Sequence, residues 1–170
     1  MNSIKFRLGQ IADHPELLEM AQCYRRELAR RNMPCSWPNK DIYHQASLWY
    51  NETPMTVCLF APMDTSDHRA VYNAGAYTLP SWRRLGLYSF LIDICVNHWR
   101  TEDKYDWFKS GFNKGNEASR MMQFKQGREF YEERATHVRT RLSLRPTGDE
   151  FDLTAEMLQP MLSKIEALSG

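Results

Sequence analysis

The sequence lacks several patterns that would assign the chain to a specialised class of protein. Its four cysteines are scattered and form no CxxC pair, which argues against a zinc knuckle or a dense disulfide framework and favours reduced thiols. The five histidines show no HExxH spacing, and neither a GxSxG elbow nor a GxxxxGK[ST] loop is present. We therefore expect no metal site, no serine nucleophile elbow and no phosphate-binding loop of the GxxxxGK[ST] type.

A large net charge and a long apolar run are also missing, since the formal net charge is only +1. The 22 lysines and arginines nearly balance the 21 acidic residues, so no global field draws the chain to nucleic acid or to an anionic membrane. The most apolar stretch, 85–96, carries Asp93 and is too short to span a bilayer. The first ten residues lack the apolar core of a signal peptide. We expect a soluble, cytoplasmic protein with no membrane partner.

The patterns that are present predict one α/β domain, which suits a length of 170 residues. Period-two alternation and β-rich composition predict strands at 4–8, 55–61, 69–79, 104–112 and 136–144. Helical spacing predicts helices from a cap at Asp13 to about Asn32 and at 41–50, 87–99, 117–126 and 153–168, with Pro160 breaking or kinking the last. We expect a loop at 33–39, a hairpin connection at 64–68, a domain over 1–145 and a C-terminal extension with its helix over 146–170.

The stretch LPSWRRLGLYSFL, at 79–91, places two arginines and a glycine between a strand and a helix. A helix that begins near Leu87 exposes unpaired backbone N–H groups and the positive end of its dipole, which together favour an anion. Gly86 allows the backbone to turn and approach a ligand, while Arg83 and Arg84 can grip phosphate. The segment predicts a site for a phosphate-bearing cofactor, and an ordinary solvated turn is the alternative.

The same stretch resembles the acyl-CoA-binding motif of the GCN5-related N-acetyltransferases (GNAT), which reads Pro-x-x-Arg/Gln-x-x-Gly-x-Gly/Ala before a helix. Arg83 and Gly86 match this motif, and Tyr88 stands where the second glycine or alanine is expected. A ring at position 88 either points outward or fills the diphosphate seat, and we expect it to point outward.

A second segment, NEASRMMQFKQGREF, resembles the family pattern Asn-x-x-Ala-x-x-Leu-Tyr-x-x-x-Gly-Phe. Asn116 and Gly127 hold their places in the pattern, whereas Gln123 replaces the tyrosine and Arg128 the phenylalanine. The two segments occur in the family's order along the chain, and the predicted order of elements over 1–145 is also similar.

The resemblance implies a mixed central sheet with helices on both faces, acetyl-CoA as the acyl donor and a primary amine of unknown class as the acceptor. It places the diphosphate on the backbone amides after Arg83 and the pantetheine arm beside the end of the strand at 69–79. The cofactor-binding residues it implies are Thr78, Leu79, Arg83, Arg84, Leu85, Gly86, Leu87, Tyr88, Ser89 and Asn116.

The resemblance also implies direct attack of the amine on the thioester, with a backbone N–H near Thr78 or Leu79 stabilising the oxyanion. In the family a tyrosine protonates the leaving thiolate, and Gln123 at that position cannot supply a proton. Tyr131, Tyr88 or a water could do so, although Tyr131 could also be a packing residue. No carboxylate lies in the strand at 69–79, so the general base stays open.

Two rivals to the transferase hypothesis remain. The departures at Tyr88 and Gln123 suit a domain of this fold that has lost catalysis and serves in binding or assembly. Arg139 and Arg141 share one face of a strand, with Arg145 joining them if the alternation continues, and this suits an enzyme that modifies nucleic acid. The apolar stripe of the helix at 153–168 covers the domain's own sheet or pairs with a second subunit, and we expect a homodimer.

Overall fold

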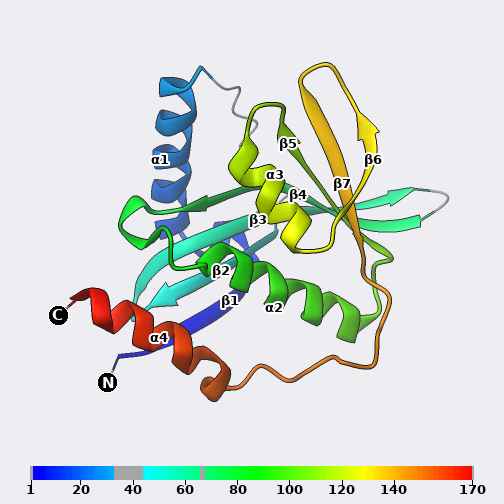
Figure 1. Cartoon of the computed structure of the whole chain (residues 1–170). Helices are drawn as coiled ribbons and strands as arrows, with labels where there is room; N and C mark the ends of the chain where they lie inside the picture. Colours follow the sequence, from blue (N-terminus) through cyan, green and yellow to red (C-terminus); the bar gives the residue numbers. More distant parts are fainter. Residues whose placement is uncertain (1, 33–43, 66–67, 170) are drawn as a thin grey trace. The chain divides into compact units, whose positions relative to one another are not determined.

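The computed structural model describes residues 2–32, 44–65 and 68–169 (Figure 1). Its strands are β1 Ile4–Gln10, β2 His44–Tyr50, β3 Thr53–Thr65, β4 His68–Thr78, β5 Trp107–Asn113, β6 Glu129–Glu133 and β7 His137–Ser143. Its α-helices are α1 Glu16–Arg30, α2 Leu87–Glu102, α3 Glu117–Lys125 and α4 Ala155–Ser169. The strands hydrogen-bond in the order β1-β2-β3-β4-β5-β7-β6, and β4 and β5 form a parallel pair. The predicted α/β class with a mixed sheet is confirmed.

The chain forms two compact units that differ from the predicted division at residue 145. The first unit contains 1–60, 74–94 and 151–170, and the second contains 61–73 and 95–150. β3, β4 and α2 each contribute residues to both units. The division into 1–145 and 146–170 stays a prediction.

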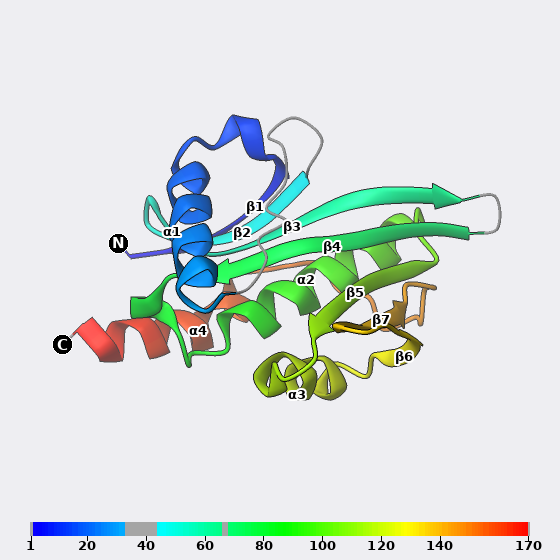
Figure 2. The ribbon, with the colours of Figure 1, turned by 90° about the horizontal axis from the view of Figure 1, so that it is seen from above.

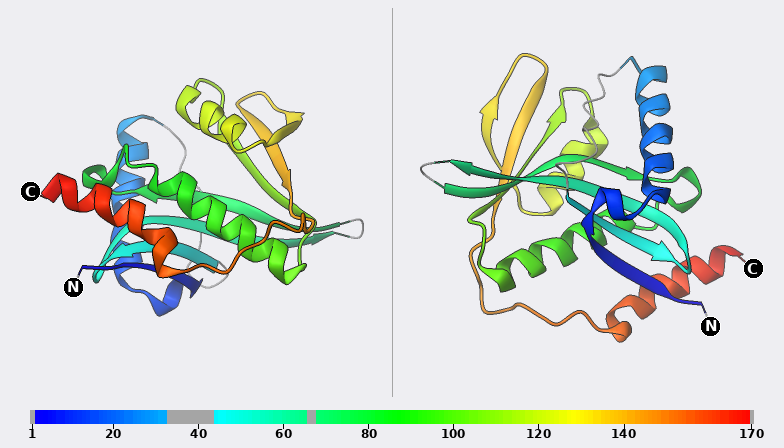
Figure 3. Two further views of the ribbon diagram at one scale, coloured as in Figure 1. Left: turned by 60° about the horizontal axis from the view of Figure 1, so that its bottom comes forward. Right: turned by 180° about the vertical axis from the view of Figure 1, so that it is seen from behind.

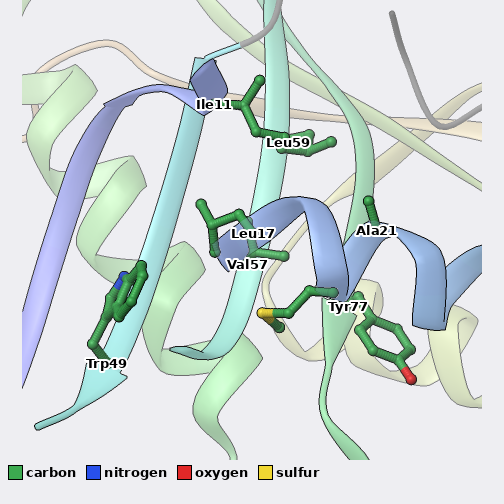
Figure 4. Packing of buried hydrophobic residues seen from close by; sticks show 8 residues of the cluster. Ile11, Leu17, Ala21, Trp49, Val57, Leu59 and Tyr77 are labelled. Carbon is green, nitrogen blue, oxygen red and sulfur yellow. The ribbon is translucent and has the colours of Figure 1, made fainter. Parts of the chain in front are cut away.

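The first unit is built around the antiparallel strands β1, β2 and β3. Within it, α1 lies on one face of these strands, and α4 and the first turns of α2 lie on the other (Figures 2 and 3). Apolar side chains from α1 and the strands form the core beneath α1 (Figure 4). The buried members are Ile11, Leu17, Met20, Ala21, Trp49, Val57, Leu59 and Tyr77. Burying a large apolar side chain contributes roughly 1.5–3 kcal/mol, so this cluster holds α1 on the sheet.

The apolar stripe of α4 is partly used within the first unit. Met161 and Ile165 are buried, whereas Met157 and Leu168 are exposed. The helix continues through Pro160 and is not broken there. A proline removes one backbone hydrogen bond, and the burial of Met161 and Ile165, which follow Pro160 in α4, favours continuation of the helix.

The second unit contains the antiparallel pairs β5–β7 and β6–β7. Burial alternates strictly along β5, so Phe108, Ser110 and Phe112 form a buried face. Trp99 of α2 packs against Phe108 on that face, with 5.2 Å between ring centroids. Thr140 of β7, the partner of Ser110, donates its hydroxyl to Gln123 of α3 at 2.5 Å, which places α3 on the same side. The side chains of the other face are half-buried.

Three details of the sequence-based prediction are corrected. Residues 44–50 form a strand and not a helix, because β1 and β3 pair with them on both sides. Asp13 does not cap α1: it ends a short 3₁₀ turn, and Pro15 occupies the cap position. β6 was not predicted, because its charged sequence EFYEE lacks an apolar alternation. The predicted loop at 33–39 and residues 41–43 lie outside the described residues, as do 66 and 67 of the hairpin connection.

Candidate active site

The turn between β4 and α2 has the backbone geometry of an anion seat. A 3₁₀ turn over Pro80–Trp82 follows β4, and then Arg84 and Gly86 take positive φ values of 67° and 77°. The Phe90 N–H donates to the Gly86 oxygen at 3.0 Å as the helix ladder begins. The amides of 87–89 precede that bond, at the helix end where N–H groups have no intrahelical acceptor. The helix dipole adds positive potential at the same place.

Gly86, directly before α2, has open space where a side chain would begin. A Cβ built on Gly86 meets no atom within 4 Å, so no close packing within the chain demands a glycine here. Its positive φ favours glycine on conformational grounds. The turn therefore combines two positive φ values with open space at the Cβ position of Gly86, directly before the start of α2, and these features fit a diphosphate.

The side chain of Arg83 is committed to the protein and not to this open space. Its guanidinium forms a two-point ion pair with Glu27 of α1, with distances of 3.2 Å from Nη1 to Oε1 and 2.6 Å from Nη2 to Oε2. Its Nε donates to the backbone oxygen of Thr78 at 2.9 Å. Arg83 thus ties the start of the turn to α1 and to the end of β4.

Tyr77 completes this group beside the end of β4. Its hydroxyl donates to Glu27 at 3.2 Å, and its ring lies 5.4 Å from that of Tyr24. Hydrogen bonding to Arg83 holds the pKa of Glu27 below its ordinary value. Burial, followed by the nearby Glu27 charge, raises the pKa of Tyr77. At neutral pH the group is a carboxylate, a guanidinium and a neutral phenol.

The other predicted residues of the turn divide by exposure. Arg84 is exposed, whereas Leu87 is buried beneath the helix. Leu85, Tyr88 and Ser89 are half-buried. Arg84 is therefore better placed than Arg83 to meet a ligand in solvent.

The end of β4 is firmly held to β3. The Thr78 hydroxyl lies 2.8 Å from that of Thr56, and the Leu79 N–H donates to the Met55 oxygen at 3.1 Å. The Leu79 amide is thus engaged in the sheet, and the strand end is a rigid edge.

Three predicted site residues belong to the second unit. Asn116 caps α3, where its side-chain oxygen accepts from the Ser119 N–H at 3.2 Å. Gln123 is 3% exposed, donates to Gly111 and to the Ser119 hydroxyl, and accepts from the Thr140 hydroxyl at 2.5 Å. Gln123 therefore connects α3 with β5 and β7.

Tyr131 lies in β6 at an irregularity of the β6–β7 pairing, between Phe130 and Glu132. Its ring contacts two cations, with Lys109 Nζ 5.4 Å and the Arg141 guanidinium carbon 5.8 Å from its centroid. Burial raises the pKa of Tyr131, so its hydroxyl keeps its proton at neutral pH.

Comparison with known proteins establishes the fold. No protein-family model matches the sequence, and no curated protein does. A GNAT-family acetyltransferase of Listeria monocytogenes 4b F2365 superposes with a TM-score of 0.64 at 10% identity, over 82% of this chain and 94% of that one. The ribosomal-protein-S18-alanine N-acetyltransferase of Escherichia coli gives 0.60 at 13% identity, over 90% and 100%. Campylobacter jejuni N-acetyltransferase PseH, in complex with acetyl coenzyme A, gives 0.57 at 14% identity, over 82% and 99%.

The chain therefore has the fold of the GNAT acetyltransferases, which confirms the class of fold that the two sequence motifs predict. None of the helices in the described part of the chain is long and apolar enough to cross a bilayer. Glu27 is the site residue that sequence reasoning missed. It lies within the amphipathic helix α1, 56 positions before Arg83 in the sequence. The one signal in the sequence is a charged residue on a partly apolar face of that helix, which suggests that it has a charged partner.

Proposed function

We propose that the chain is an acyl-CoA-dependent N-acyltransferase that transfers an acetyl or similar acyl group to a primary amine. The observation that carries this proposal is the turn at Arg84–Gly86, which takes positive φ values directly before α2 and leaves the Cβ position of Gly86 uncovered. GNAT-fold neighbours solved with acetyl-CoA support the choice of cofactor.

Acetyl-CoA would be held by the backbone of the turn from Arg84 to Ser89, with the Arg84 side chain as the mobile positive charge. Arg83 would act indirectly, because its ion pair with Glu27 fixes the turn. When bound, the cofactor supplies an acyl group as a thioester, whose carbonyl carbon bonds to the amine nitrogen as the carbon–sulfur bond breaks and the thiolate leaves. Thr78, at the edge of β4, would flank the thioester, while the engaged Leu79 amide is not used as an oxyanion donor.

Tyr131 is the proposed proton donor to the thiolate, because its phenol carries a proton that can be donated, whereas the amide of Gln123 cannot supply one. Gln123 is a positioning residue: its bond to Thr140 holds β7, which pairs with the strand that carries Tyr131. Glu27 supplies a carboxylate near the end of β4, although the Arg83 charge makes it a weak base. The amine proton would leave through water.

Calorimetric titration with acetyl-CoA tests the cofactor site. We expect Arg84→Ala to weaken binding about tenfold or more, the size of a lost charge-assisted hydrogen bond. Gly86→Ala would weaken it further, because the added Cβ enters the open approach to the amides. Gly148→Ala is the matched control, since Gly148 also has a positive φ of 88° and an unobstructed Cβ position. The absence of binding at millimolar acetyl-CoA would refute the proposal.

Turnover is measured as release of free thiol in the presence of primary amines. A cofactor-dependent signal that Tyr131→Phe reduces by about tenfold or more would support the assigned donor, since general acids contribute at least that much when needed. A chain that binds acetyl-CoA but releases no thiol with any amine would be a binding domain that has lost catalysis.

A homodimer and a cytoplasmic location stay predictions. Met161 and Ile165 are buried within the first unit, whereas Met157 and Leu168 are exposed large apolar residues of α4 that a second subunit could cover. Gel filtration of a Leu168→Glu variant tests this interface, and an unchanged apparent mass would remove α4 from it.

A further inference from the structure

One face of β5, β7 and β6 in the second unit gathers positive charge and aromatic rings. The strand register places Lys109 opposite Arg141, and Gly111 opposite Arg139. On the other side of β5, Tyr72 of β4 is the partner of Lys109. Directly paired residues of neighbouring strands project to the same face. α3 and the part of α2 in this unit contact the opposite face, through Thr140 and Phe108.

The side chains of this face contact one another. Arg141 stacks over the Trp107 ring, with 4.3 Å from its guanidinium carbon to the centroid, and also approaches Tyr131. Lys109 of β5 lies over the Tyr131 ring of β6. We refer to this surface as the cationic face, whose members are Arg139, Arg141, Lys109 and Tyr131. Their arrangement is a set of charges held by rings and strands, not a scatter of mobile surface side chains.

Among the described residues of this surface, cationic side chains outnumber carboxylates. In the described part of the chain, two carboxylates serve three arginines: Glu129 pairs with Arg141, and Glu132 is shared between Arg134 at 2.7 Å and Arg139 at 3.1 Å. Lys109 adds a further charge. The Arg139 Nε is buried and has no hydrogen-bond acceptor among the described residues.

The lowered pKa of Lys109 reflects both its burial and the positive charge around it. Burial is the main cause that lowers the pKa of Lys109, and the charges of Arg141 and Arg139 lower it further. Like charges are thus held together at partly desolvated positions, an arrangement that an oxyanion would stabilise. Arginine forks suit the two oxygens of a carboxylate or phosphate.

We propose that the cationic face binds an anionic group of the acceptor, so that the acceptor is a primary amine that also carries a carboxylate or a phosphate. This inference rests on the proposed transferase function for its catalytic meaning. Tyr131, the proposed proton donor, is itself part of the face, so an acceptor anchored there is held beside the group that completes the reaction. A small amine with one oxyanion suits three cations better than a polyamine, which they would repel.

Three short primary amines test the proposal by calorimetry on the full chain without acetyl-CoA: ethanolamine, β-alanine and O-phosphoethanolamine. We expect one or both anionic probes to bind at least about tenfold more tightly than ethanolamine, the effect of one charge-assisted contact. β-Alanine and O-phosphoethanolamine separate a carboxylate from a phosphate. Equal binding of all three, or none by any, would overturn the proposal.

Arg141→Gln and Arg139→Gln should each weaken the preferred anionic probe by about fivefold or more. Arg120→Gln is the matched control, because Arg120 also forms an ion pair with a glutamate, Glu117 on α3, and is not a member of the face. Thermal melts identify a variant that fails to fold, and Lys109→Met then supplies a second test, since it keeps the apolar stem. Equal losses in Arg120→Gln would overturn the assignment.

Turnover separates this inference from the proposed function. A preference for anionic amines in kcat/KM that Arg141→Gln abolishes supports both. Anion binding without turnover supports the anion site and overturns only the transferase assignment. Turnover that is equally fast with ethanolamine overturns the inference alone. Displacement of the bound anion by adenosine 3′,5′-bisphosphate, or by a short RNA at low salt, would assign the face to cofactor or nucleic acid and overturn it as an acceptor site.

Discussion

The ion pair between Glu27 and Arg83 offers the sharpest test of how the candidate site is supported. Both oxygens of Glu27 contact the guanidinium, and the two side chains remain 30% and 38% exposed. Exposed pairs contribute up to about 1 kcal/mol, and breaking a fully buried pair costs about 3–5 kcal/mol. For a half-buried two-point pair we expect a coupling of about 1–2 kcal/mol.

A double-mutant cycle with Glu27→Gln, Arg83→Met and the double variant measures this coupling by urea unfolding. Glu27→Gln alone should lower Tm by about 2–8 °C if the loss is about 1–2 kcal/mol, because 1 kcal/mol corresponds to about 2–4 °C in a chain of this size. Glu117→Gln is the control: its pair with Arg120 is exposed, at 64% and 45%, and should contribute about 0.3–0.5 kcal/mol.

The coupling should also depend on pH with a defined sign. Folding lowers the pKa of Glu27, chiefly through Arg83, so the folded state binds the proton less readily than the unfolded chain. The stabilisation is therefore present above the ordinary pKa of glutamic acid and is lost as the pH falls through the lower, folded-state value. The raised pKa of Arg83 has no effect in this range. A coupling below about 0.3 kcal/mol at neutral pH, the scatter expected between independent sites, would refute the reasoning.

Two further changes test the packing of the second unit. Gly111→Ala should reduce the free energy of unfolding by about 1–3 kcal/mol, because the new Cβ would lie 3.0 Å from the Val138 backbone oxygen. Gly127→Ala is the comparison: its Cβ would meet no atom within 4 Å, so it should cost only the backbone strain of a positive φ, about 1–2 kcal/mol. Gln123→Leu should lower the free energy of unfolding by about 2–4 kcal/mol in urea, because the Thr140 hydroxyl and the Gly111 oxygen lose their hydrogen-bond partner. Adding Thr140→Val should recover part of that loss, and fully additive effects of the two substitutions would contradict a shared hydrogen-bond network.

The sequence alone determined those features that depend on neighbours along the chain. The β4–α2 junction is one, because the strand end, Gly86 and the helix start are all encoded within a dozen residues. The spacing of Asn116 and Gly127 marks both ends of α3 for the same reason: a cap side chain and a residue with positive φ act locally. These two segments were sufficient to predict the fold.

Tertiary structure decided what partners those segments meet. Residues 44–50 became a strand because β1 and β3 supply hydrogen bonds on both edges, which no local pattern reveals. Arg83 was predicted to hold phosphate, yet it meets Glu27 from a helix 56 positions earlier. Lys109 and Arg141 become neighbours only through the β5–β7 register. Local periodicity encodes which face a side chain takes, whereas long-range pairing selects the charge that stands opposite it.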